Sequence, residues 1–382
     1  MENENLPINL FVPTFRIDEI LLEIRQCLEK GWTGLGYKTI EFEKAWCNYT
    51  GLPFSHFLNS ATAGLHLALK IFKENESWSD EDEIITTPIT FISTNHVILY
   101  ENLRPVFADI DEYLCISPKS LLEKISPKTR AVIFVGIGGN VGRLKEIAVI
   151  CKEKGLKLIL DAAHMSGTRW LDGVHVGKEA DVTVFSYQAV KNLATADSGM
   201  ICFANRFYDQ EVRKWTWLGI NKDTYTRTES DNSYKWHYDV EHIGFKYHGN
   251  SIMAAMGLVG LKYLEQDNAY RRQLAKWYEL FLKNEIEIVP MNNEAESSRH
   301  LFQVLVDKRD EVMLALNKLN IFPGVHYNTN MDYRMYKRDK KLFPIATSVS
   351  QKVISLPLHL RLNIADVQRV SVSLVNIVNK LK

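Results

Sequence analysis

The segment RAVIFVGIGGNVGRLKEIAVICKEKGLKLILDA, residues 130–162, contains a complete strand–helix–strand pattern. Two nearly continuous apolar runs, RAVIFVG and LKLILDA, flank a stretch whose apolar residues recur at helical spacing. Such runs suit strands that are buried on both faces, and a helical crossover between two of them makes the strands parallel. The segment therefore predicts a βαβ unit within a parallel sheet.

The same alternation extends from residue 60 to about residue 204. Further apolar runs are EIITTP, PVFADI, DVTVFSY and MICFA, and SATAGLHLALKIFK at residues 60–73 has helical spacing. We predict a doubly wound α/β domain with a large, mostly parallel sheet, whose ligands bind beyond the carboxyl ends of the strands. Asp161 and Ser186 each follow such a strand, so chemistry is expected beside them.

The rest of the chain divides around this domain. A helix is expected over residues 17–31, and residues 213–248, rich in Trp, Tyr and Lys, are expected to form a functional loop. A helix at about residues 252–266 then leads to a smaller C-terminal α/β domain. The predicted organisation is an N-terminal helical segment at 1–30, a large domain at 31–264 and a small domain at 265–382.

Composition narrows the class of protein. The 382 residues include 46 basic and 46 acidic side chains, a balance that argues against a surface built to bind nucleic acid. No run approaches the ~18 apolar residues of a membrane-spanning helix, and the first residues lack the pattern of a secretory signal. The five scattered cysteines form no CxxC, which predicts neither a disulfide framework nor a metal site. We expect a cytoplasmic protein without nucleic-acid or membrane partners.

The glycine-rich turn GIGGNVG at residues 136–142 suggests one alternative. It follows a strand and precedes a helix, and the next strand ends in an acid, as in dinucleotide-binding folds. The register fails, however, because G-x-G-x-x-G requires glycine where the chain has Val141. A tight strand-to-helix turn is the favoured interpretation, and a nicotinamide-dependent oxidoreductase remains the alternative.

Four motifs carry a more specific pattern. They are Asn59-Ser-Ala-Thr-Ala-Gly64 at a predicted helix start, Thr86-Thr-Pro-Ile-Thr-Phe91 after a strand, Asp161-Ala-Ala-His164, and Ser186-Tyr-Gln-Ala-Val-Lys191. A pyridoxal phosphate site needs a lysine amine, an acid for the pyridine nitrogen, donors for the phosphate and a flat side chain against the ring. A helix N-terminus with small residues favours an anion such as phosphate. The motifs together indicate a pyridoxal phosphate enzyme.

The chain resembles the DegT/DnrJ/EryC1/StrS family of pyridoxal-phosphate aminotransferases, which have fold type I and act on nucleotide-linked keto-sugars. The resemblance covers nearly the whole chain. It runs through GWTGLGYKTIEFEKAW (31–46), NSATAGLHLAL (59–69), TPITFISTNHVILYENLRPVFADID (87–111), LILDAAHMSG (158–167), FSYQAVKNL (185–193), GFKYHGNSIMAAMGL (244–258), GVHY (324–327) and SLPLH (355–359).

The resemblance implies a role for each matching residue. Lys191 corresponds to the lysine that forms the Schiff base and later moves the proton, and Asp161 to the acid beside the pyridine nitrogen. Phe91 corresponds to the aromatic side chain on the ring. The other implied cofactor-binding residues are Ala61, Thr62 and Ser186 for the phosphate and His164 near the ring hydroxyl.

Structural roles remain alternatives for several of these residues. Thr62 and Ser186 could be capping residues, Asp161 could close a turn, and His164 and Phe91 could be ordinary core residues. Trp32, Trp217 and His326 are implied contacts of the substrate. The tryptophans of the 213–248 loop, Trp236 among them, could instead simply pack.

Three positions depart from the family pattern. The glycine-rich run after the lysine reads Ala196-Asp-Ser-Gly199, and the usual histidine after the preceding strand is Gly136, which we expect to enlarge the pocket. Lys246 replaces an asparagine that reaches the phosphate of the partner subunit, and its ammonium could pair with phosphate there. These departures affect the expected identity of the substrate more than that of the cofactor.

The resemblance predicts transamination in two half-reactions. The expected donor is an amino acid, L-glutamate above all, and the expected acceptor is a nucleotide-linked 4-keto-6-deoxyhexose used for surface polysaccharides or glycoconjugates. A homodimer with shared active sites is implied. The alternatives are a smaller phosphorylated ketone as the acceptor, a sugar dehydratase, and a regulatory protein that binds the cofactor without turnover.

Overall fold

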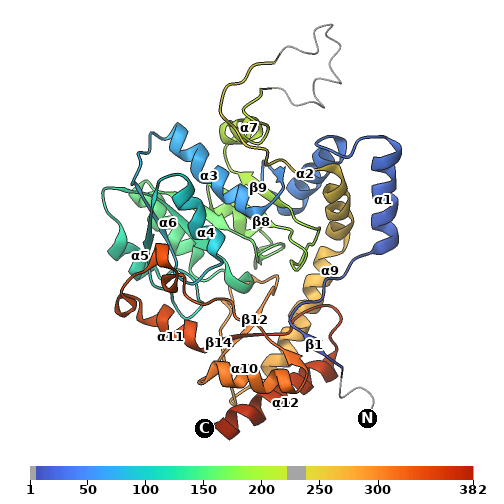
Figure 1. Cartoon of the computed structure of the whole chain (residues 1–382), viewed down its shortest axis with the longest axis vertical. Helices are drawn as coiled ribbons and strands as arrows, with labels where there is room; N and C mark the ends of the chain where they lie inside the picture. Colours follow the sequence, from blue (N-terminus) through green and yellow to red (C-terminus); the bar gives the residue numbers. More distant parts are fainter. Residues whose placement is uncertain (1–5, 222–237, 382) are drawn as a thin grey trace.

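The computed structural model describes residues 6–221 and 238–381 (Figure 1). Within them, a large sheet with helices on both faces lies above a smaller sheet that is packed against C-terminal helices. The helices are α1 (Ile17–Glu29), α2 (Tyr37–Thr50), α3 (Ala61–Asn75), α4 (Ile92–Tyr100), α5 (Pro118–Lys124), α6 (Leu144–Lys154), α7 (Arg206–Trp215), α9 (Ser251–Leu282), α10 (Arg309–Lys318), α11 (Pro344–Lys352) and α12 (Ile364–Leu381).

The large sheet has the strand order β2-β9-β8-β6-β5-β3-β4. All neighbouring strands in it are parallel except the two pairs that involve β9. Its strands are β2 (His56–Leu58), β3 (Glu83–Thr86), β4 (Arg104–Phe107), β5 (Thr129–Val135), β6 (Lys157–Asp161), β8 (Val182–Ser186) and β9 (Gly199–Phe203). The predicted fold class is confirmed, and each apolar run identified from the sequence between residues 83 and 204 contains a strand.

Two hydrophobic layers sandwich this sheet, because alternate strand residues point to opposite faces. On β5, Ile133 packs toward α3, α4 and α7, whereas Phe134 packs toward α2, α5, α6 and the first half of α9. Both faces are therefore buried, which explains why the strands read as continuous apolar runs rather than alternating ones.

The smaller sheet is antiparallel, with the order β10-β12-β14. Its strands are β10 (Glu287–Ile288), β12 (Phe302–Leu305) and β14 (Val353–Leu356), and two further two-stranded pairs join β1 (Ile8–Asn9) to β13 (Ile321–Phe322) and β7 (Arg169–Trp170) to β11 (Ala295–Glu296). The parallel β1–β13 pair attaches the N-terminal segment to the C-terminal part of the chain. No sequence pattern predicted this pairing, because two residues are too few to show a period.

Helix α9 corrects one expectation. The helix predicted to end near residue 266 continues to Leu282, since no glycine or proline interrupts residues 261–282 and buried residues such as Leu274 and Tyr278 continue the helical spacing. The helix thus packs against α1 and α2 at one end and against α12 at the other. The boundary drawn between residues 264 and 265 falls inside this helix.

The 213–248 segment is only partly described. Residues 213–215 complete α7, and Trp215 is buried against α3, with Lys70 over its ring. Residues 222–237, including Trp236, lie outside the described residues.

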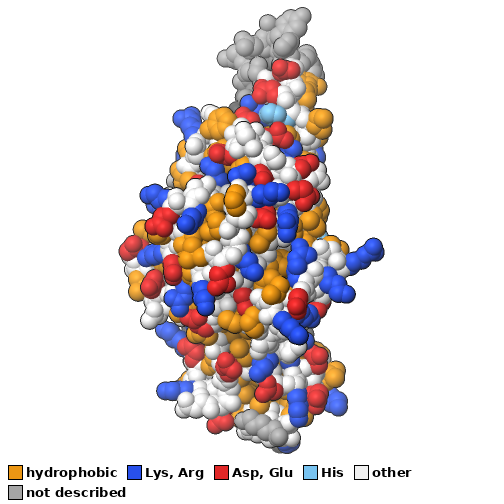
Figure 2. All heavy atoms as spheres, turned by 90° about the vertical axis from the view of Figure 1, so that its left-hand side faces the viewer, with side chains coloured by type: hydrophobic (Ala, Val, Ile, Leu, Met, Phe, Trp, Pro, Cys, Tyr) orange, Lys and Arg blue, Asp and Glu red, His pale blue; other side chains and the backbone are white. Residues whose placement is uncertain are grey.

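The charges on the surface and the apolar character of the helices are the features that concern the partners expected from the sequence. Lysine and arginine side chains intermingle with aspartate and glutamate over the face shown in Figure 2. Across residues 6–221 and 238–381, no helix combines the length and apolar character needed to cross a bilayer.

Candidate active site

A cavity of about 440 Å³ opens at the carboxyl ends of the parallel strands. Strand-end residues from β5, β6 and β8 line it, as do the start of α3 and residues of the 297–327 segment. Of the residues predicted from the sequence, those that line the cavity are Ala61, Thr62, Phe91, Asp161, His164, Ser186, Lys191 and His326. Residues far apart in the chain thus meet at the edge of the sheet where doubly wound folds bind ligands.

Lys191 and Asp161 dominate the electrostatics of the cavity. Burial lowers the pKa of Lys191 to about 8, although the Asp161 carboxylate partly opposes this shift. Burial raises the pKa of Asp161, against the hydrogen bond that Thr94 donates to its Oδ2 (2.8 Å), the backbone N–H of Ala163 on Oδ1 (3.2 Å) and the charge of Lys191. The site therefore holds, within one cavity, a nearly buried acid and an amine whose pKa is low enough for a fraction of it to be neutral near physiological pH.

The start of α3 offers donors for an anion. The Ser60 side chain caps the helix by accepting a hydrogen bond from the N–H of Ala63 (3.1 Å), which leaves the N–H groups of Ala61 and Thr62 in the first turn. Ala61, Thr62 and Ser186 all line the cavity. A helix N-terminus with free N–H groups is a favourable place for phosphate.

Two aromatic side chains and a histidine form another part of the wall. Phe91, at 58% exposure, lies with its ring centroid 6.1 Å from that of Tyr327. The N–H of Gly138 donates to Nδ1 of His164 (3.1 Å), so the proton of this imidazole is on Nε2, which lies 3.3 Å from the Tyr327 hydroxyl. Burial holds the pKa of His164 well below its ordinary value, and the ring is therefore a neutral hydrogen-bond donor.

Sequence reasoning missed several residues of the cavity, His300 and Tyr327 foremost. His300 is 1% exposed, and its Nδ1 donates to Oδ1 of Asn192 (2.9 Å), while the Asn192 amide donates to Asn268 and to the Ser298 carbonyl. This bonding leaves Nε2 of His300 as an acceptor. His300 lies just before β12, in SSRHLFQVLV. In the sequence, a single histidine before a strand was the only feature that could have indicated a site residue there.

Position 136 corrects a second expectation. A Cβ placed on Gly136 would lie 2.0 Å from Sδ of Met165, a side chain that is fully buried. The thioether fills the space beside the missing side chain, so glycine here does not by itself enlarge the pocket.

Other residues of the chain pack against the glycine-rich turn at residues 136–142. Gly138 and Gly139 have positive φ angles of 65° and 92°, and a Cβ on Gly139 would meet Oγ of Ser297 at 2.7 Å. The Gly138 carbonyl accepts the N–H of His300 (3.0 Å). The 297–300 segment therefore covers the face of the turn that a pyrophosphate would need, and the nicotinamide alternative loses its support.

Three predicted residues do not line this cavity. Lys246 places its Nζ 3.2 Å from the ring centroid of Trp217, and Trp217 packs beside His248. Trp32 donates from Nε1 to the carbonyl of Leu35 (2.7 Å) in the turn before α2. Within one chain, these side chains are therefore not part of the cavity wall around Lys191.

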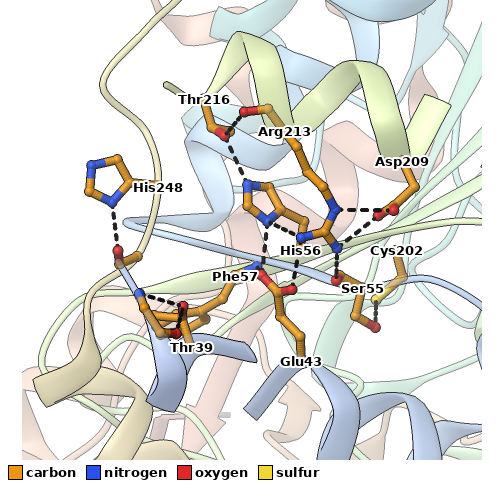
Figure 3. A network of polar contacts seen from close by, with 12 residues as sticks. Thr39, Glu43, Ser55, His56, Phe57, Cys202, Asp209, Arg213, Thr216 and His248 are labelled. Atoms are coloured by element: carbon orange, nitrogen blue, oxygen red, sulfur yellow. Dashed lines mark hydrogen bonds and ion pairs between the residues drawn. The ribbon is translucent and has the colours of Figure 1, made fainter. Parts of the chain in front are cut away.

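A buried polar network holds the base of the 213–248 segment (Figure 3). Arg213 of α7 donates to Glu43 of α2 (3.0 Å) and forms an ion pair with Asp209 (3.1 Å). His56 of β2 bridges Glu43 and Thr216, at 2.8 Å from each. Burial raises the pKa of Glu43, but the Arg213 charge and the contact with His56 outweigh it and lower the pKa to about 2.

The residues present fit pyridoxal phosphate. The wall combines a lysine amine, an acid, a helix N-terminus and an aromatic ring in a single cavity. Among the described residues, the Lys191 amine forms no ion pair within 4 Å, so it is available to an incoming aldehyde. The donor set therefore matches what the cofactor requires.

Comparison with known proteins identifies a family of aminotransferases. The model of the DegT/DnrJ/EryC1/StrS aminotransferase family matches residues 16–375. The chain is 33% identical to the uncharacterized protein MJ1066 of Methanocaldococcus jannaschii, with 97% of each chain covered. It is 32% identical to the spore coat polysaccharide biosynthesis protein SpsC of Bacillus subtilis, with 96% of each covered.

A solved structure is also similar. The putative sugar aminotransferase Spr1654 of Streptococcus pneumoniae, in its PMP form, is 26% identical over 97% of this chain and 99% of its own, with a TM-score of 0.90. A PLP form of the same protein superimposes equally well, with a TM-score of 0.89. With the match to the family model and the relatives above 30% identity, the conclusion is direct: the chain belongs to the DegT/DnrJ/EryC1/StrS family of aminotransferases.

Proposed function

We propose that this chain transfers the amino group of an amino acid, L-glutamate above all, to a keto-sugar. The expected acceptor is a nucleotide-linked 4-keto-6-deoxyhexose that serves the synthesis of a surface polysaccharide. The observation that carries the proposal is that Lys191 and Asp161 line one cavity together with the start of α3. SpsC, named for polysaccharide biosynthesis, supports the proposed product class.

Pyridoxal phosphate, the cofactor of this enzyme, supplies an electron sink for carbanion chemistry when it is bound. Asp161 would hold the ring nitrogen protonated, and Ala61, Thr62 and Ser186 would bind the phosphate. Phe91 would pack on the ring, and His164 would donate from Nε2 to its hydroxyl oxygen.

Lys191 would move the proton at the substrate carbon. Its pKa of about 8 makes the neutral amine accessible near physiological pH, as a general base requires. His326, whose pKa burial lowers to about 4, would contact the sugar as a neutral ring. The 31–264 and 265–382 parts of the chain would contribute opposite walls of the substrate cleft.

A screen of possible acceptors tests the proposal. The protein is loaded with pyridoxamine phosphate and mixed with individual keto-sugar nucleotides, while the absorbance of the aldehyde form of the cofactor is followed. We expect at least one 4-keto-6-deoxyhexose nucleotide to restore that absorbance and give an aminosugar, and Lys191→Ala to give neither. Return of the absorbance only with small phosphorylated ketones, or a dehydrated sugar as product, would contradict the proposal.

A further inference from the structure

Two threonine hydroxyls form a chain of hydrogen bonds that leads to the acid of the cavity. Thr94, in the first turn of α4, donates from Oγ1 to Oδ2 of Asp161 (2.8 Å), and Oγ1 of Thr90 lies 2.9 Å from Oγ1 of Thr94. All three side chains are buried. Thr90 and Asp161 line the cavity, whereas Thr94 lies behind Asp161 and is not part of the wall. Any influence of Thr94 on a bound cofactor must therefore pass through Asp161.

The chain has a definite direction when Asp161 is ionised. A carboxylate only accepts hydrogen bonds, so the single proton of the Thr94 hydroxyl is used on Asp161, and Thr90 must donate to Thr94. Each hydroxyl polarises the next one, which strengthens the bond that reaches the carboxylate. The order Thr90 to Thr94 to Asp161 therefore favours the ionised form of the acid.

The structure of α4 does not account for this use of the Thr94 hydroxyl. A threonine inside a helix commonly bonds to the carbonyl four residues earlier, which for Thr94 is the carbonyl of Thr90. Here the Thr90 carbonyl accepts a hydrogen bond from the side-chain amide of Asn330 (2.9 Å), and the Thr94 hydroxyl is directed at Asp161 instead.

The C-terminal part of the chain fixes the segment that carries both threonines. Besides its bond to Thr90, Asn330 accepts a hydrogen bond from the side-chain amide of Asn95 (2.8 Å) and donates its backbone N–H to the carbonyl of Pro88 (2.7 Å). The segment from Pro88 to Asn95 is thus held at three points. The Thr94 hydroxyl is therefore in place before any cofactor binds.

The bond from Thr94 also opposes the effect of burial on the acid. Burial raises the pKa of Asp161, and the hydrogen bond from Thr94 is the largest of the influences that lower it, ahead of the Ala163 N–H and the Lys191 charge. Without this bond, the carboxylate would become a stronger base and would compete with a pyridine nitrogen for a proton shared between them. The position of that proton decides whether the ring carries the positive charge.

We propose that Thr94 is a positioning residue of the cofactor site, whose hydroxyl keeps the Asp161 carboxylate ionised, so that the shared proton stays on the ring nitrogen of pyridoxal phosphate. The inference rests on the role proposed above for Asp161, but it does not depend on which amino donor or keto-sugar is used. Because the protonated ring is the better electron sink, Thr94 acts on the reaction without touching the substrate.

Nitrogen-15 NMR of the holoenzyme, reconstituted with pyridoxal phosphate labelled at the ring nitrogen, measures where this proton lies. In the wild type at neutral pH, we expect the resonance of a protonated ring nitrogen. Thr94→Val replaces the hydroxyl with a methyl group and should lower the ratio of proton on nitrogen to proton on carboxylate roughly 10-fold or more, as for a lost hydrogen bond to a charged group. The resonance should therefore move toward the unprotonated position.

Two further variants test whether the hydroxyl itself is responsible. Thr90→Val removes the donor to Thr94 and should move the resonance in the same direction by a smaller amount. Thr94→Ser keeps the hydroxyl and should restore the resonance of the wild type.

Thr183→Val is the matched control. Thr183 of β8 is also buried and donates to the carbonyl of Gly177 (2.9 Å), so its loss removes a comparable hydrogen bond that does not involve Asp161. The ring-nitrogen resonance of this variant should match that of the wild type.

Asp161→Asn separates failure of this inference from failure of the role proposed for Asp161. If the ring nitrogen loses its proton in Asp161→Asn but keeps it in both Thr94→Val and Thr90→Val, Thr94 only fills space and the inference is wrong. A displacement in Thr94→Ser as large as that in Thr94→Val would also overturn it, since the hydroxyl would then have no effect. A resonance that even Asp161→Asn leaves unchanged would contradict the role of Asp161 itself, and the inference with it.

Discussion

At the scale of single residues, the pair Lys191 and Asp161 determines the chemistry. Each shifts the pKa of the other in the direction that favours its charged form, while burial acts against both charges. Because burial is the larger influence on Lys191, the pKa of its amine is about 8 rather than near the ordinary value for lysine.

This balance predicts a pH dependence. The rate at which the apoenzyme captures pyridoxal phosphate requires the neutral Lys191 amine, so it should rise with pH to a plateau with a midpoint of about 8. In Asp161→Asn the carboxylate that raises this pKa is gone, and the midpoint should move below that of the wild type. Stopped-flow absorbance across pH 6–11 provides the measurement, and Asp197→Asn, an exposed acid of the same cavity, is the control. A wild-type midpoint near that of free lysine would contradict the prediction.

The sequence indicated these two residues because Asp161 ends a buried strand, Lys191 belongs to the motif that begins at the strand end Ser186, and both motifs are local. His300 and Tyr327 gave no comparable signal, since they reach the cavity from the C-terminal part of the chain through long-range packing. The position of Met165 could not be predicted from the sequence either. Its thioether fills the space beside Gly136, and this contact joins segments that follow two different strands.

At the scale of elements, polar networks fix the positions of the strands and helices around the site. Asn268 of α9 bonds to Asn192 and to the Ser166 carbonyl, and so ties the lysine loop to the long helix. The network of Glu43, His56 and Arg213 joins α2, β2 and α7 beneath the 213–248 segment. The sequence predicted the strands of the large sheet between residues 83 and 204 and several helices, because their patterns are local. It did not predict β2, these polar contacts or the length of α9.

Glu43→Gln should destabilise the fold by about 2–4 kcal/mol at pH 7, because it leaves Arg213 and His56 with less negative charge in a buried site. The folded-state pKa of Glu43 lies at about 2, below its unfolded value, so the stabilisation is complete above about pH 4.5 and declines as the pH falls toward 2. Urea unfolding at pH 7 and pH 3 measures the free energy of unfolding of the wild type and of Glu43→Gln. The difference between these two free energies should be smaller at pH 3. Glu41→Gln, on the exposed side of α2, should change stability by less than about 0.5 kcal/mol. If the free energies of unfolding of the wild type and Glu43→Gln differ by the same amount at pH 7 and pH 3, this account is wrong.

At the scale of the whole molecule, the cavity needs both parts of the chain. The end of β6 provides Asp161, the segment between β8 and β9 provides Lys191, and the C-terminal part of the chain provides His300 and His326. Lys246 and Trp217 do not line the cavity of their own chain. For Lys246, the prediction is that its ammonium reaches the phosphate site of a partner subunit. Their arrangement could not be predicted from the sequence, since it depends on the path of residues 213–248.

Subunit complementation tests that expectation. Lys191→Ala and Lys246→Ala should each abolish or strongly reduce amine transfer. If Lys246 serves the partner's site, an equal mixture of the two, reassociated from dissociated subunits, should regain about a quarter of wild-type activity, because half of the dimers then carry one intact site. Activity no higher than the mean of the separate variants would show that Lys246 does not act across subunits.

The central claim is that the Lys191 amine is covalently joined to pyridoxal phosphate in the resting enzyme. Reduction of the holoenzyme with borohydride, followed by peptide mass spectrometry, tests it directly. The account predicts that the mass of the reduced cofactor is found on the peptide containing Lys191, and on no peptide of Lys191→Ala. Attachment to another lysine, or no attachment in a protein saturated with cofactor, would contradict it.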